Sequence, residues 1–526
     1  MRSTATHADA IATLIAALRR GECDETTARR LYTLGPDAVT LALLAAARRI
    51  AQQDARIAEL QAQATGGVSP ATPSGMIPVY TKPNAPASRG RRRKRPGARD
   101  GHPGHRRPRP TQIDERKEHR LKVCPCCGGP LQRCRRSRTR LVEDLPEDLH
   151  SVVTEHTIHR DYCPRCKRHV EPVIPDALPG ATFGHRLIGF TSWCHYGLGI
   201  TIDQLVDILQ YHLRTKLSAG GLIAAWRRLA DILTPWHEQI AAEAKKSAYL
   251  HADETGWRVQ GRTCWLWCFA NGQVCYYLID RCRGSPVLQR FFGEAFDGIL
   301  LHDFWTAYES IDVLDRQYCL VHLLRELEKV DQHNPTPAWQ AFAKTLRRLI
   351  RDGIRLRKRP DFRPEKYRSR ILRLGRRLDA LIAAGVVTSN ASARRTDNVA
   401  ADGSPLARSA AECRLPAEVF ADADVRRLCK RLRRTGDHLF TFLDYPQIPF
   451  ENNFAERQIR PAVILRKNSQ SNRSDRGALT QAVLMSIYRT LHLRGHDPLQ
   501  AIAAALRTYL RTGHLPPLPS ATVADG

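Results

Sequence analysis

The spacing of apolar side chains near the start of the chain predicts a helix. In residues 8–62 apolar positions recur every seven residues, as at Leu43, Ile50 and Ile57. This repeat favours a helical N-terminal segment and a short coiled coil. Because only about three heptads are present and Gln53 occupies one seam position, a helix that packs on its own domain is an equally good interpretation.

From residue 247 the pattern becomes that of short strands. AYLHADE, TCWLWCFAN and GQVCYYLID predict three strands, SPVLQRFFGEAF predicts a helix, and GILLHDF and RQYCLVHL predict a fourth and a fifth strand. The Asn271-Gly272 pair predicts a hairpin between the second and third strands. This order, with one Asp in the first strand and another after the fourth, is typical of a ribonuclease-H-like α/β fold with a mixed sheet.

Two further regions have helical periodicity. Residues 183–245 predict several amphipathic helices, and the segments Thr201–Leu209 and Ser218–Leu229 resemble two helices across a turn. Such a pair is either a helix-turn-helix DNA reader or, more commonly, a packing unit. Residues from Leu323 to Phe442 are Arg-rich and mostly helical, which predicts a helical insertion after the last strand. An exposed connection tolerates such an insertion.

These patterns together predict a multidomain α+β protein, since 526 residues exceed what one core organises. The expected parts are a helical N-terminus, a basic linker, a zinc-binding module, a helical region, the ribonuclease-H-like domain in two segments, the helical insertion and a tail. The predicted bounds are 1–65 for the helical N-terminus, 66–115 for the basic linker, 116–180 for the zinc-binding module and 181–246 for the helical region. They are 247–325 with 443–512 for the ribonuclease-H-like domain, 326–442 for the helical insertion and 513–526 for the tail.

The charge of the chain indicates a polyanionic partner. There are 82 Lys and Arg against 53 Asp and Glu, a net charge of +29, which favours double-stranded DNA. No stretch approaches about 18 uninterrupted apolar residues, so no membrane partner is expected. The N-terminus lacks the pattern of a secretory signal, and we expect a cytoplasmic protein that joins the nucleoid when bound to DNA.

The most basic cluster lies in a Pro- and Gly-rich segment that cannot fold alone. Its central residues are Arg91, Arg92, Arg93, Lys94 and Arg95. A cluster of this density is expected to bind DNA phosphates without reading sequence. The alternative is a solvated tether.

Four of the 15 cysteines form two C-x2-C pairs, Cys124 with Cys127 and Cys163 with Cys166. Each pair places two sulfurs on one side of a tight turn, and two such turns supply four thiolates for a structural Zn²⁺ ion. The strands LVEDLP and HSVVTEHTIHRDY are expected to form a hairpin between them. Cys126 and Cys134 are alternative ligands.

Three acidic side chains are candidates for a catalytic metal site. Asp253 and Asp303 each follow a short apolar run, and Glu456 lies in ENNFAERQIRPAVILRK, a predicted helix. Three carboxylates hold two Mg²⁺ or Mn²⁺ ions well, and two such ions catalyse phosphoryl transfer. The competing interpretation of Glu456 is a capping-box residue paired with Asn453. Glu254 is predicted to be a surface charge on the opposite side of its strand.

Basic residues on or after the same helix are candidates for contacts with DNA phosphates beside the metals. They are Arg457, Arg460, Arg466 and Lys467.

HADETGWRV, LLHDFWTAY, CLVHLLREL and NNFAERQIRPAVILRKNS resemble the DDE transposases of the insertion sequence sixty-six family, and GHPGH and CPCCGG match its basic linker and zinc module. The resemblance spans roughly residues 90–510. It implies Asp253, Asp303 and Glu456 as the catalytic triad for cutting and joining insertion-sequence ends. NSQSNRSDRGA departs from many members, so no role is assigned to residues 469–476.

The resemblance also implies the partners. They are the DNA of element ends and target, further copies of the chain assembled on DNA, and accessory proteins of the same element. Two alternatives stay open: a catalytically inactive DNA-binding relative, and a ribonuclease-H-like nuclease without strand transfer.

Overall fold

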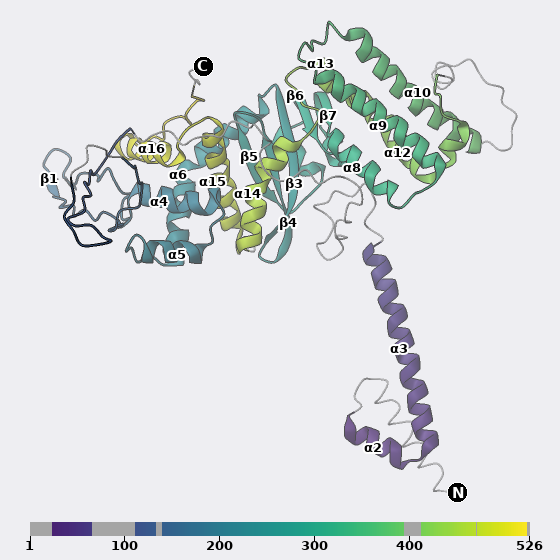
Figure 1. Ribbon diagram of the computed structural model, residues 1–526, viewed down its shortest axis with the longest axis horizontal. Helices are drawn as coiled ribbons and strands as arrows, with labels where there is room; N and C mark the ends of the chain where they lie inside the picture. Colours follow the sequence, from purple (N-terminus) through teal and green to yellow (C-terminus); the bar gives the residue numbers. More distant parts are fainter. Residues whose placement is uncertain (1–23, 66–110, 133–138, 394–411, 470, 523–526) are drawn as a thin grey trace. The chain divides into compact units, whose positions relative to one another are not determined.

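The computed structural model describes residues 24–65, 111–132, 139–393, 412–469 and 471–522. The chain divides into two compact units, and Figure 1 shows the helices and strands of the described ranges. One comprises the described parts of Met1–Lys82, His322–Arg348 and Ala383–Lys430, and the other those of Pro83–Val321, Leu349–Ile382 and Arg431–Gly526. No helix in these ranges is long and apolar enough to cross a membrane.

The N-terminal segment is helical, as predicted, but it is interrupted. Helix α2 (Glu25–Thr33) ends before Gly35, whose φ of +100° breaks the helix, and α3 (Pro36–Thr65) begins at a proline. Leu43 and Ile50 are 66% and 59% exposed along α3. Among the described residues these two side chains stay exposed, and a coiled coil through them stays a prediction.

The expected strands of the cysteine-rich region are mostly absent. In the described part of this region the strands are β1 (Asp161–Cys163) and β2 (Arg168–Val170), which pair as an antiparallel hairpin. The predictions of strands at residues 141–146 and 150–160 are wrong. Val152 and Val153 are 86% and 91% exposed, so the apolar pattern finds no surface to pack against, and an isolated strand gains no stability from its pattern alone.

A five-stranded mixed sheet forms the centre of the second unit. Its strands are β3 (Tyr249–Val259), β4 (Arg262–Ala270), β5 (Cys275–Asp280), β6 (Ala295–His302) and β7 (Asp312–Tyr318), in the order β5-β4-β3-β6-β7. The β3–β4 and β4–β5 pairs are antiparallel, whereas β3–β6 and β6–β7 are parallel. The predicted hairpin turn is present, with the Asn271 N–H bonded to the Val274 carbonyl at 2.9 Å. This order is compatible with the expected ribonuclease-H-like arrangement.

One expected strand is too long. The fifth strand ends at Tyr318, and Leu320 begins helix α8 (Leu320–Asp331). The buried apolar residues of α8 recur at three- and four-residue spacing, at Leu320, Leu323, Leu327 and Val330. That is the period of a helix, and it outweighs the short strand-like run Cys-Leu-Val.

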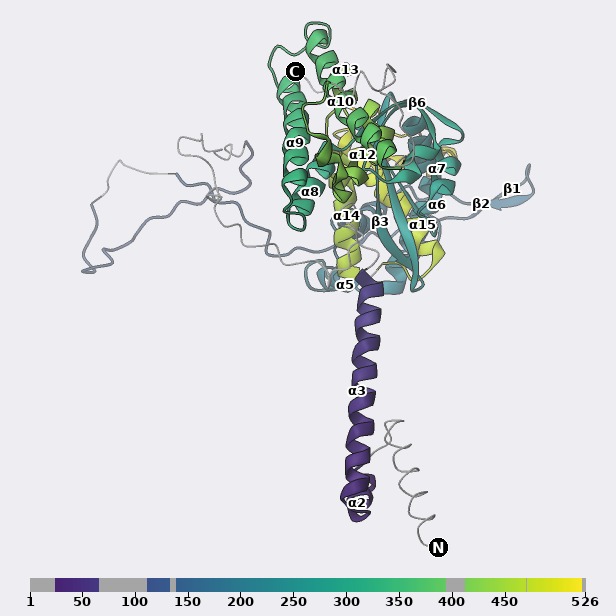
Figure 2. The same cartoon turned by 90° about the vertical axis from the view of Figure 1, so that its right-hand side faces the viewer.

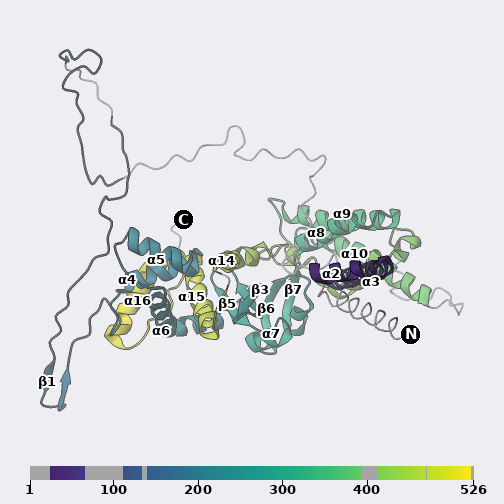
Figure 3. The same cartoon turned by 90° about the horizontal axis from the view of Figure 1, so that it is seen from below.

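Helices cover the β5 end of the sheet (Figure 3). They are α4 (His185–Ser192), the π-helix Trp193–Gly197, α5 (Ile202–Tyr211), α6 (Ala219–Lys245), α15 (Asp475–Leu493) and α16 (Pro498–Thr512). The expected helices of residues 201–229 are present, with N-caps Thr201 and Ser218. Helix α6 buries nine residues, including Trp226 and Trp236, so it packs as a core helix. DNA reading by this pair stays a prediction.

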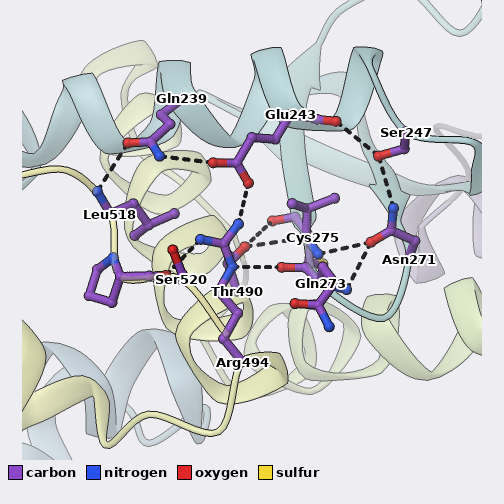
Figure 4. A network of polar contacts seen from close by, with 12 residues as sticks. Gln239, Glu243, Ser247, Asn271, Gln273, Cys275, Thr490, Arg494, Leu518 and Ser520 are labelled. Atoms are coloured by element: carbon purple, nitrogen blue, oxygen red, sulfur yellow. Dashed lines mark hydrogen bonds and ion pairs between the residues drawn. The ribbon is translucent and has the colours of Figure 1, made fainter. Parts of the chain in front are cut away.

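Side chains of α15 form hydrogen bonds with backbone N–H groups of β5, the edge strand of the sheet. Ser486 accepts a hydrogen bond from the Tyr277 N–H at 2.9 Å, and Thr490 accepts one from the Cys275 N–H at 3.0 Å. Unpaired edge groups would otherwise invite pairing with another chain. Arg494, 5% exposed after α15, binds Glu243 of α6 and the carbonyls of Gln273 and Pro519 (Figure 4). This network fixes α6 and the C-terminal segment beside the sheet.

A helical segment separates β7 from the helix that carries Glu456, as predicted. It contains α8, α9 (Pro337–Arg357), α10 (Arg368–Ala393), the 3-10 turn Ala417–Ala421, α12 (Ala423–Thr435), the 3-10 turn Gly436–His438 and α13 (Thr441–Asp444). Helix α14 (Asn453–Ser469) follows. Shorter elements within the sheet region are α7 (Ser285–Phe292) and the 3-10 turn Thr306–Ser310.

Candidate active site

The sheet places Asp253 and Asp303 at the same level of neighbouring strands. The parallel register pairs Tyr249 with Ile299 and His251 with Leu301, a constant offset of 50 residues. The same offset brings Asp303, directly after β6, level with Asp253 in β3. Neighbouring strands are about 4.8 Å apart, so the two backbones hold their carboxyl groups in one region.

Helix α14 lies alongside β3 (Figure 2) and carries Glu456 in its first turn. Asn452, 1% exposed just before the helix, fixes this position. Its Nδ2 donates to the Ala252 carbonyl at 2.8 Å, and its Oδ1 accepts from His251 Nδ1 at 2.8 Å. Both polar atoms of the Asn452 amide therefore bind the strand that carries Asp253.

The three predicted acids interact electrostatically. The pKa of Asp253 is raised well above its usual value, first by burial and then by repulsion from Glu254, Asp303 and Glu456. Burial also raises the pKa of Asp303, and Glu456 adds to the shift. Arg283 and Arg431 oppose it. Like charges held in a buried region raise one another's pKa in this way.

The acids do not, however, converge to ligand distance. Within the ranges that the structure describes, no three His, Cys, Asp or Glu side chains lie close enough together to hold a metal ion. Each Asp instead binds a nearby backbone N–H: Asp253 Oδ1 accepts from Glu254 at 3.0 Å, and Asp303 Oδ1 accepts from Trp305 at 2.8 Å.

The prediction that Glu254 is a surface charge is wrong. Its side chain is 2% exposed. Its Oε1 accepts from Arg283 at 2.6 Å and its Oε2 from the Tyr308 hydroxyl at 2.5 Å. Alternation does turn Glu254 away from Asp253, but that side of β3 is also covered. Burial and Asp303 raise the pKa of Glu254 to about 6.

Arg283 is the principal counter-charge of this region. Its guanidinium lies 4.4 Å from the ring of Trp265 and 4.2 Å from that of Trp305, and it is 11% exposed. Two indole faces and a carboxylate hold it rigidly. Sequence reasoning missed Arg283, Tyr308 and Arg431 because each lies in a connection or a remote helix. Nothing in their local pattern distinguishes them from surface residues.

The donor set fits divalent cations. Asp253, Asp303 and Glu456 offer hard oxygen ligands of the kind that Mg²⁺ and Mn²⁺ prefer. Burial is the largest cause of the raised pKa of both aspartates, and repulsion from neighbouring acids adds to it. A bound cation would remove this repulsion.

The predicted phosphate-binding residues of α14 differ in exposure. Arg457, Arg460 and Lys467 are exposed. Arg466 is half-buried and donates to Thr255 Oγ1 at 3.3 Å and to the Gly256 carbonyl. Arg466 therefore ties α14 to β3, while the other three remain accessible.

The two cysteine turns have the local geometry of metal knuckles. Gly128, with a φ of +71°, donates to the Cys124 carbonyl at 2.9 Å, and Cys124 donates to the Gly129 carbonyl at 3.0 Å. In the β1–β2 hairpin the Cys166 N–H donates to Cys163 Sγ at 3.4 Å.

Backbone N–H groups lower the pKa of both leading cysteines. The Cys126 N–H has the largest effect on Cys124, and the Cys166 N–H on Cys163. Each turn thus favours a thiolate. The two turns are not joined into one four-sulfur site in the described chain. Cys134 and the basic cluster at residues 91–95 lie outside the described residues.

Residues 180–480 match the model of the Transposase IS66 family. The chain belongs to this family. The matched segment covers β3, β6 and α14, and hence all three predicted acids, in agreement with the resemblance seen in the sequence motifs. The chain is also similar to the uncharacterized protein y4jD of Sinorhizobium fredii (strain NBRC 101917 / NGR234), with 22% identity over 431 residues, 74% of this chain and 75% of that protein.

Proposed function

We propose that this IS66 family transposase binds the ends of an insertion sequence and catalyses strand cleavage and strand transfer with Asp253, Asp303 and Glu456. The observation that carries the proposal is the coincidence of the family match with the position of these acids: two at one level of adjacent strands, and one on the helix that Asn452 fixes to β3. Membership of a transposase family itself implies a DNA-processing enzyme.

The residues would divide the work as follows. Asp253, Asp303 and Glu456 would hold two Mg²⁺ or Mn²⁺ ions, and when bound these would supply the Lewis-acid chemistry that an in-line phosphoryl displacement needs. The sheet and the two hydrogen bonds of the Asn452 amide to β3 restrict the motion of the acids. Few side chains would therefore have to become ordered when the site assembles. Arg283 and Arg431 offset part of the negative charge beside Asp303.

Other parts of the chain would contact DNA or stabilise the fold. Arg457, Arg460 and Lys467 are exposed on α14 and suited to bind the phosphates next to the scissile bond. The cysteine turns at 124–127 and 163–166 would share one structural Zn²⁺ ion. The basic cluster at 91–95 would add affinity for any duplex.

A donor-plasmid assay tests the proposal. A supercoiled plasmid carrying the element ends is incubated with the protein, Mg²⁺ and target DNA, and products joined to the target are scored. We expect joined product. Cleavage without joining would instead indicate a nuclease, and binding without cleavage would indicate an inactive relative.

A further inference from the structure

A groove lined by arginines lies between α9 and α10, within the second unit. Eight residues line its volume of about 280 Å³: Asp352, Arg355, Leu356, Arg359, Arg370, Arg373, Leu374 and Arg377. The four from the α9 side and the four from α10 have the same spacing, i, i+3, i+4 and i+7. This spacing defines one face of a helix, so the groove is the seam where two helix faces meet.

The floor of the groove is apolar and its walls are basic. Leu356 and Leu374 are 7% and 6% exposed and hold the helices together. The arginines around them stand in the solvent. Facing rows of like charge repel one another and oppose the packing that the two leucines favour. The stability of the helix pair therefore does not explain why arginines occupy these positions.

The groove arginines outnumber their acidic partners. Five guanidinium groups face a single carboxylate, Asp352, whose oxygens lie 3.5 Å from Arg355 and 3.3 Å from Arg377. Arg359 pairs with Asp361 at 3.2 Å. In the part of the chain that the structure describes, Arg373 makes no ion pair.

Two other arginines of the same segment make contacts within the protein. Arg357 donates to the Pro446 carbonyl, and Arg368 pairs with Asp444 at 2.8 Å. Residues 349–382 contain twelve Lys and Arg against four Asp and Glu. The segment therefore carries a surplus of positive charge, and five of its arginines line this one groove.

We propose that this arginine groove binds the phosphates of one strand of duplex DNA without reading its sequence. One guanidinium group can donate two parallel hydrogen bonds to the oxygens of a phosphate, and it stays protonated at any pH that a protein tolerates. From Arg370 to Arg377 the row runs for roughly 10 Å along α10. That length matches about three successive phosphates of one strand, at about 3.4 Å of helix axis each. This inference rests on the proposed function, because it assumes DNA as the substrate.

The experiment compares two triple variants that lose equal charge. The groove variant is Arg355→Gln, Arg370→Gln and Arg373→Gln. The control is Arg351→Gln, Arg363→Gln and Arg376→Gln, at exposed positions of the same segment that do not line the groove. Binding of a linear duplex of random sequence is measured in EDTA, which prevents metal-dependent cleavage, over a series of salt concentrations.

We expect the groove variant to lose about 10²-fold in affinity near 0.1 M salt, and the slope of log K against log salt to fall by up to about 2.7, since each lost phosphate contact contributes about 0.9. The control is expected to lose less than about threefold. A version with lysine at the three groove positions keeps the charge and should retain most of the salt slope. The lysine version and the thermal unfolding of each variant together distinguish a loss of DNA contacts from a folding defect.

Equal losses in the groove and control variants would overturn the inference, because net charge alone would then explain them. Binding of poly-glutamate is measured with the same variants. A groove variant that loses poly-glutamate binding while its duplex binding is unchanged would also overturn the inference, in favour of an acidic protein partner. A wild-type protein that binds no duplex would refute the proposed function and the groove together, whereas wild-type binding with an unaffected groove variant refutes the groove alone.

Discussion

Replacing Asp303 with Asn should stabilise the metal-free protein. The backbone register places Asp253 and Asp303 on adjacent strands, so their charges lie on the order of 5 Å apart, and their repulsion is about 3 kcal/mol at an effective dielectric constant of 20. Arg283 and Arg431 offset part of it. Because the Asn Oδ1 can still accept the Trp305 N–H, we expect a net gain of about 1–2 kcal/mol at pH 8.

The gain should depend on pH with a defined sign. The pKa of Asp303 is raised in the folded protein above the usual 3.8, so the folded state binds the proton more tightly than the unfolded state. The wild type therefore loses stability as the pH rises through the raised pKa. The advantage of Asp303→Asn should be largest above the raised pKa and should vanish well below pH 3.8, where Asp303 is protonated in both states of the wild type.

The assay is denaturant unfolding followed by tryptophan fluorescence in EDTA, with Asp297→Asn, an exposed position of the same strand, as the control. Adding Mg²⁺ should reverse the order, because an ion that binds only the folded state stabilises it, by about 2.7 kcal/mol at a hundred times its Kd, and the variant lacks one of the proposed ligands. A variant no more stable than the control, or equal stabilisation of both proteins by Mg²⁺, would refute the reasoning.

Three further results are expected. Purified protein should contain one Zn²⁺ per chain by metal analysis, lost when Cys124 and Cys163 are both changed to Ser, and zinc-free protein from a reducing preparation would contradict the site. Neutralising residues 91–95 should weaken binding to every duplex and flatten its salt dependence in titrations while leaving the preference for element ends unchanged; a loss of end preference alone would make the segment a sequence reader. Asn452→Ala should lower the free energy of unfolding by about 2–4 kcal/mol, because it leaves the His251 ring and the Ala252 carbonyl without their buried partner; an unchanged value would show that these two hydrogen bonds are dispensable.

The sheet was predictable because its signals are local. Alternating apolar runs and the Asn271-Gly272 turn define β3, β4 and β5, and the position of Asp303 follows from where β6 ends. The apolar pattern predicted strands wrongly where the side chains are not buried, and where a strand-like period overlaps a helical one. Val152 and Val153 are exposed, and Cys319 stands where a strand pattern runs into the helical period of α8.

The chemistry around the acids depends on contacts between distant segments. Strand alternation predicted a surface charge at Glu254, and it could not show that Arg283, nearly 30 residues later, binds this side chain. Asn452 directly precedes helix α14. Its amide binds β3, some 200 residues earlier, and local sequence does not encode such a pairing.

Strand joining by isosteric variants of the three acids tests the central claim most directly. Asp253→Asn, Asp303→Asn and Glu456→Gln each remove one metal-ligand charge with little change of shape. In the donor-plasmid assay, each should abolish cleavage and joining while binding of the element ends persists at close to wild-type affinity. Wild-type joining by any one of the three variants would contradict the account and remove that residue from the catalytic triad.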